Sequence, residues 1–183
     1  MKEDFFTVDT YKNILLISGA GRQVGKTAFV CQIISKLKIH QITAVKISPH
    51  FHDPTPGLIH LSKGKGWIIN KESNQKNSKD SSLYLQAGVY KSYYVQAEKN
   101  CLIEMFEKLK NILPENSPVI IESARLLKII IPGISVYIIK DNSIETGKDK
   151  LNSKPNITII SNGKTFIPDS EIIIFDQGWK IRN

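Results

Sequence analysis

The segment that most constrains the fold is residues 13–37, where a short apolar run, a glycine-containing loop and an amphipathic pattern follow one another. The run NILLIS at residues 13–18 is apolar on both faces, as in a strand buried inside a sheet. From residue 26 onward, apolar side chains recur on one helix face at Val30, Ile33, Ile34 and Leu37. A buried strand followed by a tight loop and a helix predicts a unit of a parallel α/β sheet.

The loop inside this unit reads Ala-Gly-Arg-Gln-Val-Gly-Lys-Thr over residues 20–27. Gly21 and Gly25 allow a tight path in which backbone N–H groups point inward, and the following helix adds the partial positive charge of its N-terminus. Lys26 is predicted to reach the outer phosphates of a nucleotide, and Thr27 to hold Mg²⁺ through its hydroxyl. The predicted nucleotide contacts are Ala20, Gly21, Arg22, Gln23, Val24, Gly25, Lys26, Thr27 and Ala28.

The pattern of this loop differs from the usual phosphate-binding sequence at one position, because Ala20 stands where the first glycine is expected. A Gly-Lys-Thr at a helix start also occurs by chance in unrelated chains. The place of this one, between an apolar strand and an amphipathic helix, favours the functional interpretation. We therefore expect residues 20–27 to form a phosphate-binding loop.

Two acidic residues near strand ends are candidates for the metal site. Glu122 ends an apolar strand, and Asp53 lies in the loop after another. Because Mg²⁺-nucleotide sites use carboxylates near the ends of neighbouring strands, the predicted metal residues are Thr27, Asp53 and Glu122. Lys26 and Asp53 are the predicted catalytic residues. The alternatives are an ordinary strand-end acid for Glu122 and a turn-forming residue before Pro54 for Asp53.

The loop that contains Asp53 also holds His50 and His52, on either side of Phe51. Alternate spacing can place two imidazoles on one side of an extended chain. A zinc site would need further ligands, and no cysteine or third firm ligand joins this pair. We expect His50 and His52 to contact substrate or phosphate, the alternative being histidines that face solvent.

The rest of the chain continues the alternation of strands and helices. Further strands are predicted at residues 43–47, 66–69, 92–97, 119–123, 134–139, 157–161 and 171–175, with helices at 83–87 and 102–113. The fold class expected is α/β, a three-layer P-loop NTPase fold with a mainly parallel sheet of about seven strands flanked by helices. Residues 70–82 contain almost no apolar side chain and are predicted to be a mobile insert without a ligand.

Composition limits the other classes of function. With 183 residues, of which 41% are hydrophobic, the chain is expected to form one domain over residues 1–183. The net charge of +8 allows a polyanionic partner, but the lysines are scattered without interleaved aromatics, so we do not expect nucleic acid. The longest apolar stretch, residues 126–139, is interrupted and too short to span a membrane. The acidic residues in 1–6 and the isolated Cys31 and Cys101 predict a cytoplasmic protein with reduced thiols.

With these residues in place, the chain resembles the MobB-like family, the molybdopterin-guanine dinucleotide biosynthesis adaptor proteins of the P-loop class. The resemblance rests on the loop at 20–27, AVKISPHFHDPTPG at 44–57, KDSSLYLQAGV at 79–89 and VIIES at 119–123. It implies a parallel sheet flanked by helices, ATP or GTP bound with Mg²⁺, a homodimer and weak hydrolysis. It also implies that Lys26 and Thr27 hold phosphate and metal, with Asp53 and Glu122 near the Mg²⁺. The family's Glu-Gly is Glu122-Ser123 in this chain.

Three functions remain open. The first is a purine nucleotide-binding adaptor or slow Mg²⁺-dependent NTPase with a protein partner. The second is an ATP-dependent small-molecule kinase or ligase, because the Val-Gly-Lys-Thr core is also similar to that of dethiobiotin synthetase. The third, a nucleic-acid-binding protein, rests on charge alone. The sequence contains no Asn-Lys-x-Asp guanine signature, so the choice between ATP and GTP stays open.

Overall fold

The computed structural model describes residues 9–141 and 154–182. Its main sheet has nine strands in the order β3-β4-β5-β2-β6-β1-β7-β8-β9, and β10 pairs separately with β11. The strands are β1 (Thr10–Gly19), β2 (Thr43–Ser48), β3 (Leu58–Gly64), β4 (Trp67–Glu72), β5 (Lys91–Ala97), β6 (Val119–Glu122), β7 (Ile131–Lys140), β8 (Ile157–Ser161), β9 (Phe166–Ile167), β10 (Ile173–Phe175) and β11 (Trp179–Ile181). Residues 1–6, which entered the prediction of a cytoplasmic protein, lie outside the described residues.

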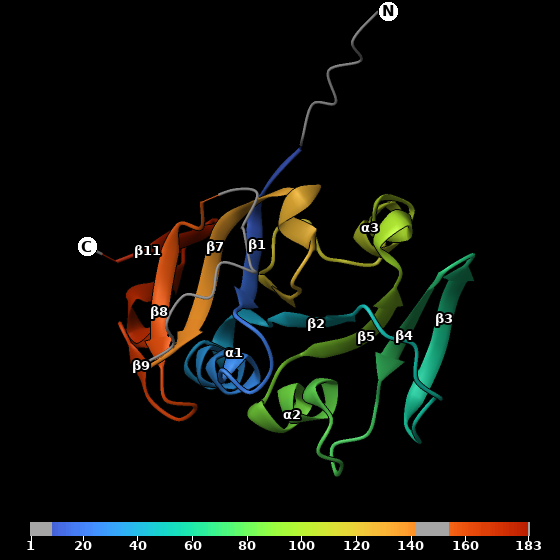
Figure 1. The fold of residues 1–183 in the computed structure, drawn as a ribbon, viewed down its shortest axis with the longest axis horizontal. Helices are drawn as coiled ribbons and strands as arrows, with labels where there is room; N and C mark the ends of the chain where they lie inside the picture. The colour runs from blue at the N-terminus through green and yellow to red at the C-terminus, as the bar shows by residue number, and fades with distance from the viewer. Residues whose placement is uncertain (1–8, 142–153, 183) are drawn as a thin grey trace, which may run out of the picture.

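The helices are few and short compared with the sheet. They are α1 (Lys26–Lys36), α2 (Asp80–Ala87) and α3 (Leu102–Lys110), with the 3-10 turns η1 (Lys38–His40), η2 (Lys99–Cys101), η3 (Leu126–Lys128) and η4 (Ser170–Ile172). Figure 1 shows α1 and α2 on one side of the central strands and α3 on the other. In the part of the chain that the structure describes, no helix has the length and apolar character needed to cross a membrane.

The inner strands of the sheet, from β5 to β8 in the sheet order, pair in parallel. Parallel sheets are covered on both faces, and successive side chains of β1 enter different cores. Leu15 and Ile17 pack with α1 and α2, whereas Ile14 and Leu16 pack on the α3 side. The apolar run at residues 13–18 is therefore buried on both faces of the sheet, as predicted.

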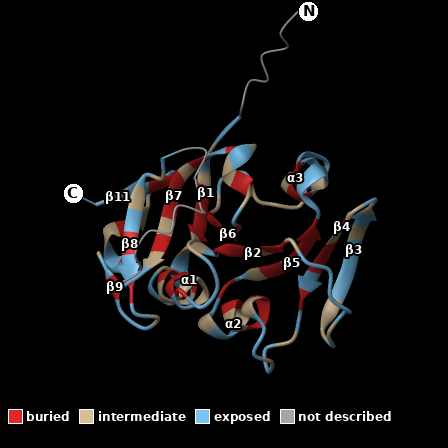
Figure 2. Ribbon diagram, viewed as in Figure 1, coloured by how far each residue is buried: buried red, intermediate tan, exposed pale blue. Residues whose placement is uncertain are grey.

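Antiparallel strands close both edges of the sheet. At one edge β3 pairs with β4 and β4 with β5, and at the other β9 pairs with β8. Figure 2 shows the central strands largely buried and β3 mostly exposed. No residue of β3 is fully buried, and its sequence LIHLSKG lacks the regular alternation of apolar and polar residues that marks a half-buried strand.

The α/β class with a mostly parallel sheet is confirmed, but the prediction of about seven strands is too low for a main sheet of nine. The missed strands are the exposed β3 and the short β9 and β11. The strand predicted at 171–175 begins as the turn η4 and is extended only over Ile173–Phe175. The insert predicted at 70–82 starts inside β4 and ends inside α2, so its irregular part is residues 73–79.

Candidate functional site

The predicted phosphate loop, residues 20–27, joins the carboxyl end of β1 to the start of α1. Gly25 has φ of 89°, and a Cβ there would lie 2.9 Å from Ser161 Oγ, so glycine is required. Helix α1 begins after Gly25 with no side-chain cap and no acidic residue in its first turn. Its first N–H groups and the positive end of its dipole therefore suit an anion.

The base of the predicted phosphate loop is held against β7. Ala20 N donates to Ile138 O at 2.9 Å, and a Cβ on Gly19 would lie 2.6 Å from that same oxygen. Lys26 folds back over the loop, where its Nζ donates to Gly21 O at 2.6 Å. Gln23 has φ of 60°, a left-handed conformation that a non-glycine residue rarely adopts. These contacts give the loop a defined, curved path.

A cluster of polar side chains lies directly beside this loop. We call it the Glu122 network, and it consists of Thr27, Lys46, Asp80, Tyr84 and Glu122. Thr27 Oγ1 lies 2.9 Å from Asp80 Oδ1 and 3.2 Å from Glu122 Oε2. Lys46 Nζ lies 2.6 Å from Asp80 Oδ2 and also pairs with Glu122 Oε1. Tyr84 donates its hydroxyl to Glu122 Oε2 at 2.6 Å.

The topology of the sheet explains how residues distant in sequence meet here. Strand β6 lies between β1 and β2, with Glu122 in register with Ile17 on one side and Lys46 on the other. Helix α2 then brings Asp80 at its first position and Tyr84 one turn later. The site therefore stands at the carboxyl ends of neighbouring parallel strands, where α/β sheets bind ligands.

The Glu122 network has a defined charge pattern. Glu122 is only 2% exposed, yet Lys46 and its hydroxyl partners compensate its carboxylate. Burial acts to lower the pKa of Lys46, but Glu122 and Asp80 outweigh it and raise the pKa overall. Burial, with the negative charge of Glu122, holds the pKa of Tyr84 well above its ordinary value. Lys46 therefore stays cationic and Tyr84 a neutral donor, and the network sets two carboxyl groups against one ammonium group.

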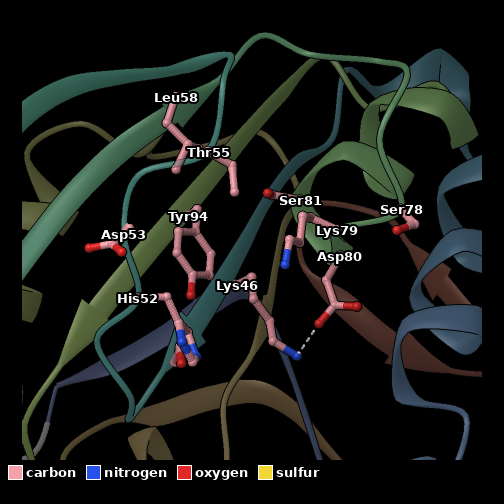
Figure 3. Close-up of a pocket in the computed structure, with 11 residues that line it drawn as sticks. Lys46, His52, Asp53, Thr55, Leu58, Ser78, Lys79, Asp80, Ser81 and Tyr94 are labelled. Atoms are coloured by element: carbon pink, nitrogen blue, oxygen red, sulfur yellow. Dashed lines mark ion pairs between the residues drawn. The ribbon is translucent and has the colours of Figure 1, made fainter.

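Two adjoining pockets open at this site. The larger, which we call the loop cleft, has a volume of about 700 Å³ and is lined by the predicted phosphate loop, the end of β2 and the Glu122 network. The smaller, which we call the side cavity, has a volume of about 270 Å³ and is shown in Figure 3. Lys46, Ser48, His52 and Asp80 line both of them.

The structure brings most of the predicted site residues together. Arg22, Gln23, Gly25, Lys26, Thr27, Ala28, His50, His52 and Glu122 all line the loop cleft. The side chain of Val24 instead lies in the core beneath the loop, at 3% exposure. Asp53 lines the side cavity, and the aspartate beside Thr27 is Asp80.

Sequence reasoning assigned no role to Lys46, Asp80 or Tyr84. Lys46 could have been noticed in the sequence, because it is the one charged residue of the buried strand TAVKIS. Asp80 carried a weaker signal as an acid at the start of a helix, which ordinarily stabilises the helix dipole. Tyr84 looks like a core aromatic in the sequence, and its hydroxyl partner becomes visible only in the structure.

The donor set suits a hard divalent cation better than a transition metal. Among the described residues, no group of three or more His, Cys, Asp or Glu side chains is arranged to hold a metal ion. Mg²⁺ needs fewer protein ligands, because it keeps several waters and is commonly bound through one or two carboxylates plus phosphate oxygens. The hydroxyl of Thr27 and the carboxylates of Asp80 and Glu122 supply such a set.

The fold and the site together define an α/β protein with a glycine-containing loop and a carboxylate network at the carboxyl edge of a mostly parallel sheet. No protein-family model matches the chain, and no curated protein or solved structure matches it either.

Proposed function

We propose that this chain binds a purine nucleotide, ATP or GTP, together with Mg²⁺ in the loop cleft, within a fold of the P-loop NTPase type. The observation that carries the proposal is the meeting of Lys26 and Thr27, at the start of α1, with the carboxylates of Asp80 and Glu122. Phosphate groups are recognised by loop N–H groups, a helix N-terminus and a lysine, and Mg²⁺ by hydroxyl and carboxylate oxygens. The chain combines both recognition elements within one cleft.

The phosphates would lie along the predicted phosphate loop. Lys26 is anchored on the Gly21 carbonyl at 2.6 Å, a neutral acceptor that a charged phosphate oxygen replaces favourably. Arg22 adds a second cationic side chain to the lining of the loop cleft. The volume of about 700 Å³ falls within the range of small-molecule sites, which supports a ligand of nucleotide size.

Thr27, Asp80 and Glu122 would hold the metal ion. Bound there, Mg²⁺ supplies neutralisation of phosphate charge and orientation of the outer phosphate groups. The network sets two carboxyl groups against one ammonium group, which favours addition of a cation. In the metal-free chain, Lys46 pairs with both carboxylates and so offsets the repulsion between them. Asp80 joins Thr27 and Glu122 in the proposed metal set, whereas Asp53, which the sequence suggested as a metal residue, lines the side cavity.

The same geometry supports slow turnover. Both carboxylates that line the loop cleft, Asp80 and Glu122, are engaged by Lys46 and so are poor bases for an attacking water. Asp53 lines the side cavity instead. We therefore propose a nucleotide-binding protein with weak hydrolysis, in the manner of the MobB-like adaptors that the sequence resembles.

Fluorescent ATP and GTP analogues, titrated in the presence and absence of Mg²⁺, test this proposal. Lys26→Ala is expected to weaken binding by about 10- to 100-fold, the value of one charge-assisted hydrogen bond. Lys63→Ala, which changes an exposed lysine on β3, serves as the matched control and should bind like the wild type. Equal affinity of Lys26→Ala and the wild type would refute a phosphate site at this loop.

A further inference from the structure

The side cavity next to Lys46 is a second pocket, and the proposed nucleotide does not occupy it. Its walls come from four segments: the end of β2, the loop 49–57 with the start of β3, residues 78–81, and Tyr94 on β5. Figure 3 shows Tyr94 and Asp80 on opposite sides of the cavity, with Lys46 between them. Its volume of about 270 Å³ is equivalent to about nine water molecules in the liquid, which suits a small metabolite.

One wall of the side cavity is fixed by hydrogen bonds from the buried Gln96 and from Ser48. Gln96, only 3% exposed, donates Nε2 to the carbonyls of His50 at 3.3 Å and His52 at 3.2 Å. Ser48 adds a second tie, because its hydroxyl donates to His50 O and accepts from His50 N. A loop held by its own backbone carbonyls keeps its path without a ligand, so the wall is preformed.

The facing wall is fixed by a buried carboxylate. Glu72, at 2% exposure, accepts hydrogen bonds from Ser73 N at 3.1 Å, Asn74 N at 2.9 Å and Ser81 Oγ at 2.8 Å. The same segment is tied to the first wall, since Ser73 Oγ donates to Gly57 O at 2.7 Å. Both walls are therefore preorganised, which lowers the entropic cost of binding a ligand.

The lining of the side cavity indicates the chemistry of its ligand. Lys79 supplies a cationic group and Asp53 an anionic one, while Tyr94 supplies a hydroxyl and Leu58 an apolar contact. The hydroxyls of Ser48 and Ser81 are engaged in the wall hydrogen bonds described above. Lys46 and Asp80 are shared with the loop cleft, so a ligand here would lie next to the outer phosphate of a bound nucleotide. A small polar acid with a hydroxyl or amine fits this arrangement.

We propose that the side cavity binds the second substrate, a small carboxylate-bearing molecule that accepts the terminal phosphoryl group of the nucleotide. Lys79 recognises its carboxylate, and its hydroxyl or amine faces Lys46 and Asp80. The acceptor oxygen or nitrogen forms a bond to the terminal phosphorus, and the bond from that phosphorus to the bridging oxygen breaks. The nucleoside diphosphate leaves with the electron pair, and the acceptor proton passes to solvent. This inference rests on the proposed nucleotide site.

The test uses the full chain and a defined set of probes. The probes are the proteinogenic amino acids and the hydroxycarboxylic acids of three to six carbons. Binding is measured by saturation-transfer NMR with a non-hydrolysable ATP or GTP analogue and Mg²⁺, and nucleoside diphosphate release is measured with the hydrolysable nucleotides. Three variants accompany the wild type: Thr55→Trp to fill the cavity, Lys79→Ala to remove the cation, and Lys76→Ala as a control on the same loop outside the lining.

We expect at least one acid to bind the wild type and to raise diphosphate release. Thr55→Trp should abolish both effects, and Lys79→Ala should weaken binding of the acid by about tenfold, as for one lost charged contact. Lys76→Ala should behave as the wild type, and nucleotide affinity should be unchanged in all three variants. Two results would refute a ligand site in the side cavity while leaving the proposed nucleotide site intact. One is that nucleotide binds but no acid does, and the other is that acid binding persists in both Thr55→Trp and Lys79→Ala. If nucleotide itself fails to bind, the proposed function fails and the acceptor role fails with it.

Discussion

Replacing Lys46 with methionine removes the cation that holds two carboxylates together. In the structure Lys46 Nζ lies 2.6 Å from Asp80 Oδ2 and pairs with Glu122 Oε1. Methionine has a similar length and apolar volume but no charge. The variant therefore leaves Glu122 as a charged group in a buried position without its ionic partner, while the packing around the side chain changes little.

The expected cost follows from the burial of each partner. Removing one member of a buried ion pair costs about 3–5 kcal/mol. The side chain of Glu122 is 3% exposed and that of Asp80 is 35% exposed, so water compensates Asp80 but not Glu122. Glu122 retains the hydroxyls of Thr27 and Tyr84 as partners. We therefore expect the low end of the range, a loss of about 3 kcal/mol in the free energy of unfolding.

Urea unfolding followed by circular dichroism measures this loss. The control is Lys71→Met, which changes an exposed lysine on β4 and should alter stability by no more than about 0.5 kcal/mol. Adding Glu122→Gln to Lys46→Met removes the carboxylate left without its ionic partner and should restore at least about 1 kcal/mol of the free energy of unfolding. A loss below about 1 kcal/mol for Lys46→Met, or no recovery in the double variant, would refute the charge balance derived above.

Three further predictions concern neighbouring groups. Tyr84→Phe removes the 2.6 Å hydrogen bond to the buried Glu122 carboxylate and should lower the free energy of unfolding by about 1.5–3 kcal/mol in urea; an unchanged midpoint would contradict that bond. Burial, then the charges of Asp80 and Glu122, raises the Cys31 pKa from 9.0 to about 11, so at pH 8 its thiolate fraction is about a hundredfold lower. Alkylation of the Cys31 peptide, followed by mass spectrometry, should therefore be slow at pH 8 and rise about tenfold per pH unit until the pH approaches 11; a plateau near pH 9 would contradict it. Gly25→Ala should weaken nucleotide binding in calorimetry, because φ of 89° disfavours a side chain; unchanged affinity would show that the loop tolerates another path.

The strand, loop and helix at residues 13–37 could be predicted because every local signal in them agrees. The apolar run is buried on both faces of the sheet, and α1 begins at Lys26 as expected. Glu122 ends β6, at the strand end where the sequence placed it, and its Oε2 lies 3.2 Å from Thr27 Oγ1 because parallel strands bring their carboxyl ends to one edge. This part of the fold could be predicted from residue patterns within single helices and strands.

Partners across the sheet could not be predicted in this way. The pairing of Lys46 with Glu122 depends on the insertion of β6 between β1 and β2, which no local pattern reveals. Asp80 lies in a segment whose polar composition predicts an irregular chain. The order of residues 70–82 comes instead from buried polar groups, chiefly Glu72, whose carboxylate accepts two backbone N–H groups and the Ser81 hydroxyl.

The most direct test of the central claim is calorimetric titration with ATP and with GTP, with and without Mg²⁺, on the wild type, Asp80→Asn and Asp53→Asn. We predict saturable, Mg²⁺-strengthened binding by the wild type and by Asp53→Asn, and the nucleotide that binds more tightly identifies the preferred base. Asp80→Asn should lose the gain from Mg²⁺, because Asp80 lies beside Thr27. Failure of the wild type to bind either nucleotide, or a full Mg²⁺ effect in Asp80→Asn, would contradict the proposed site.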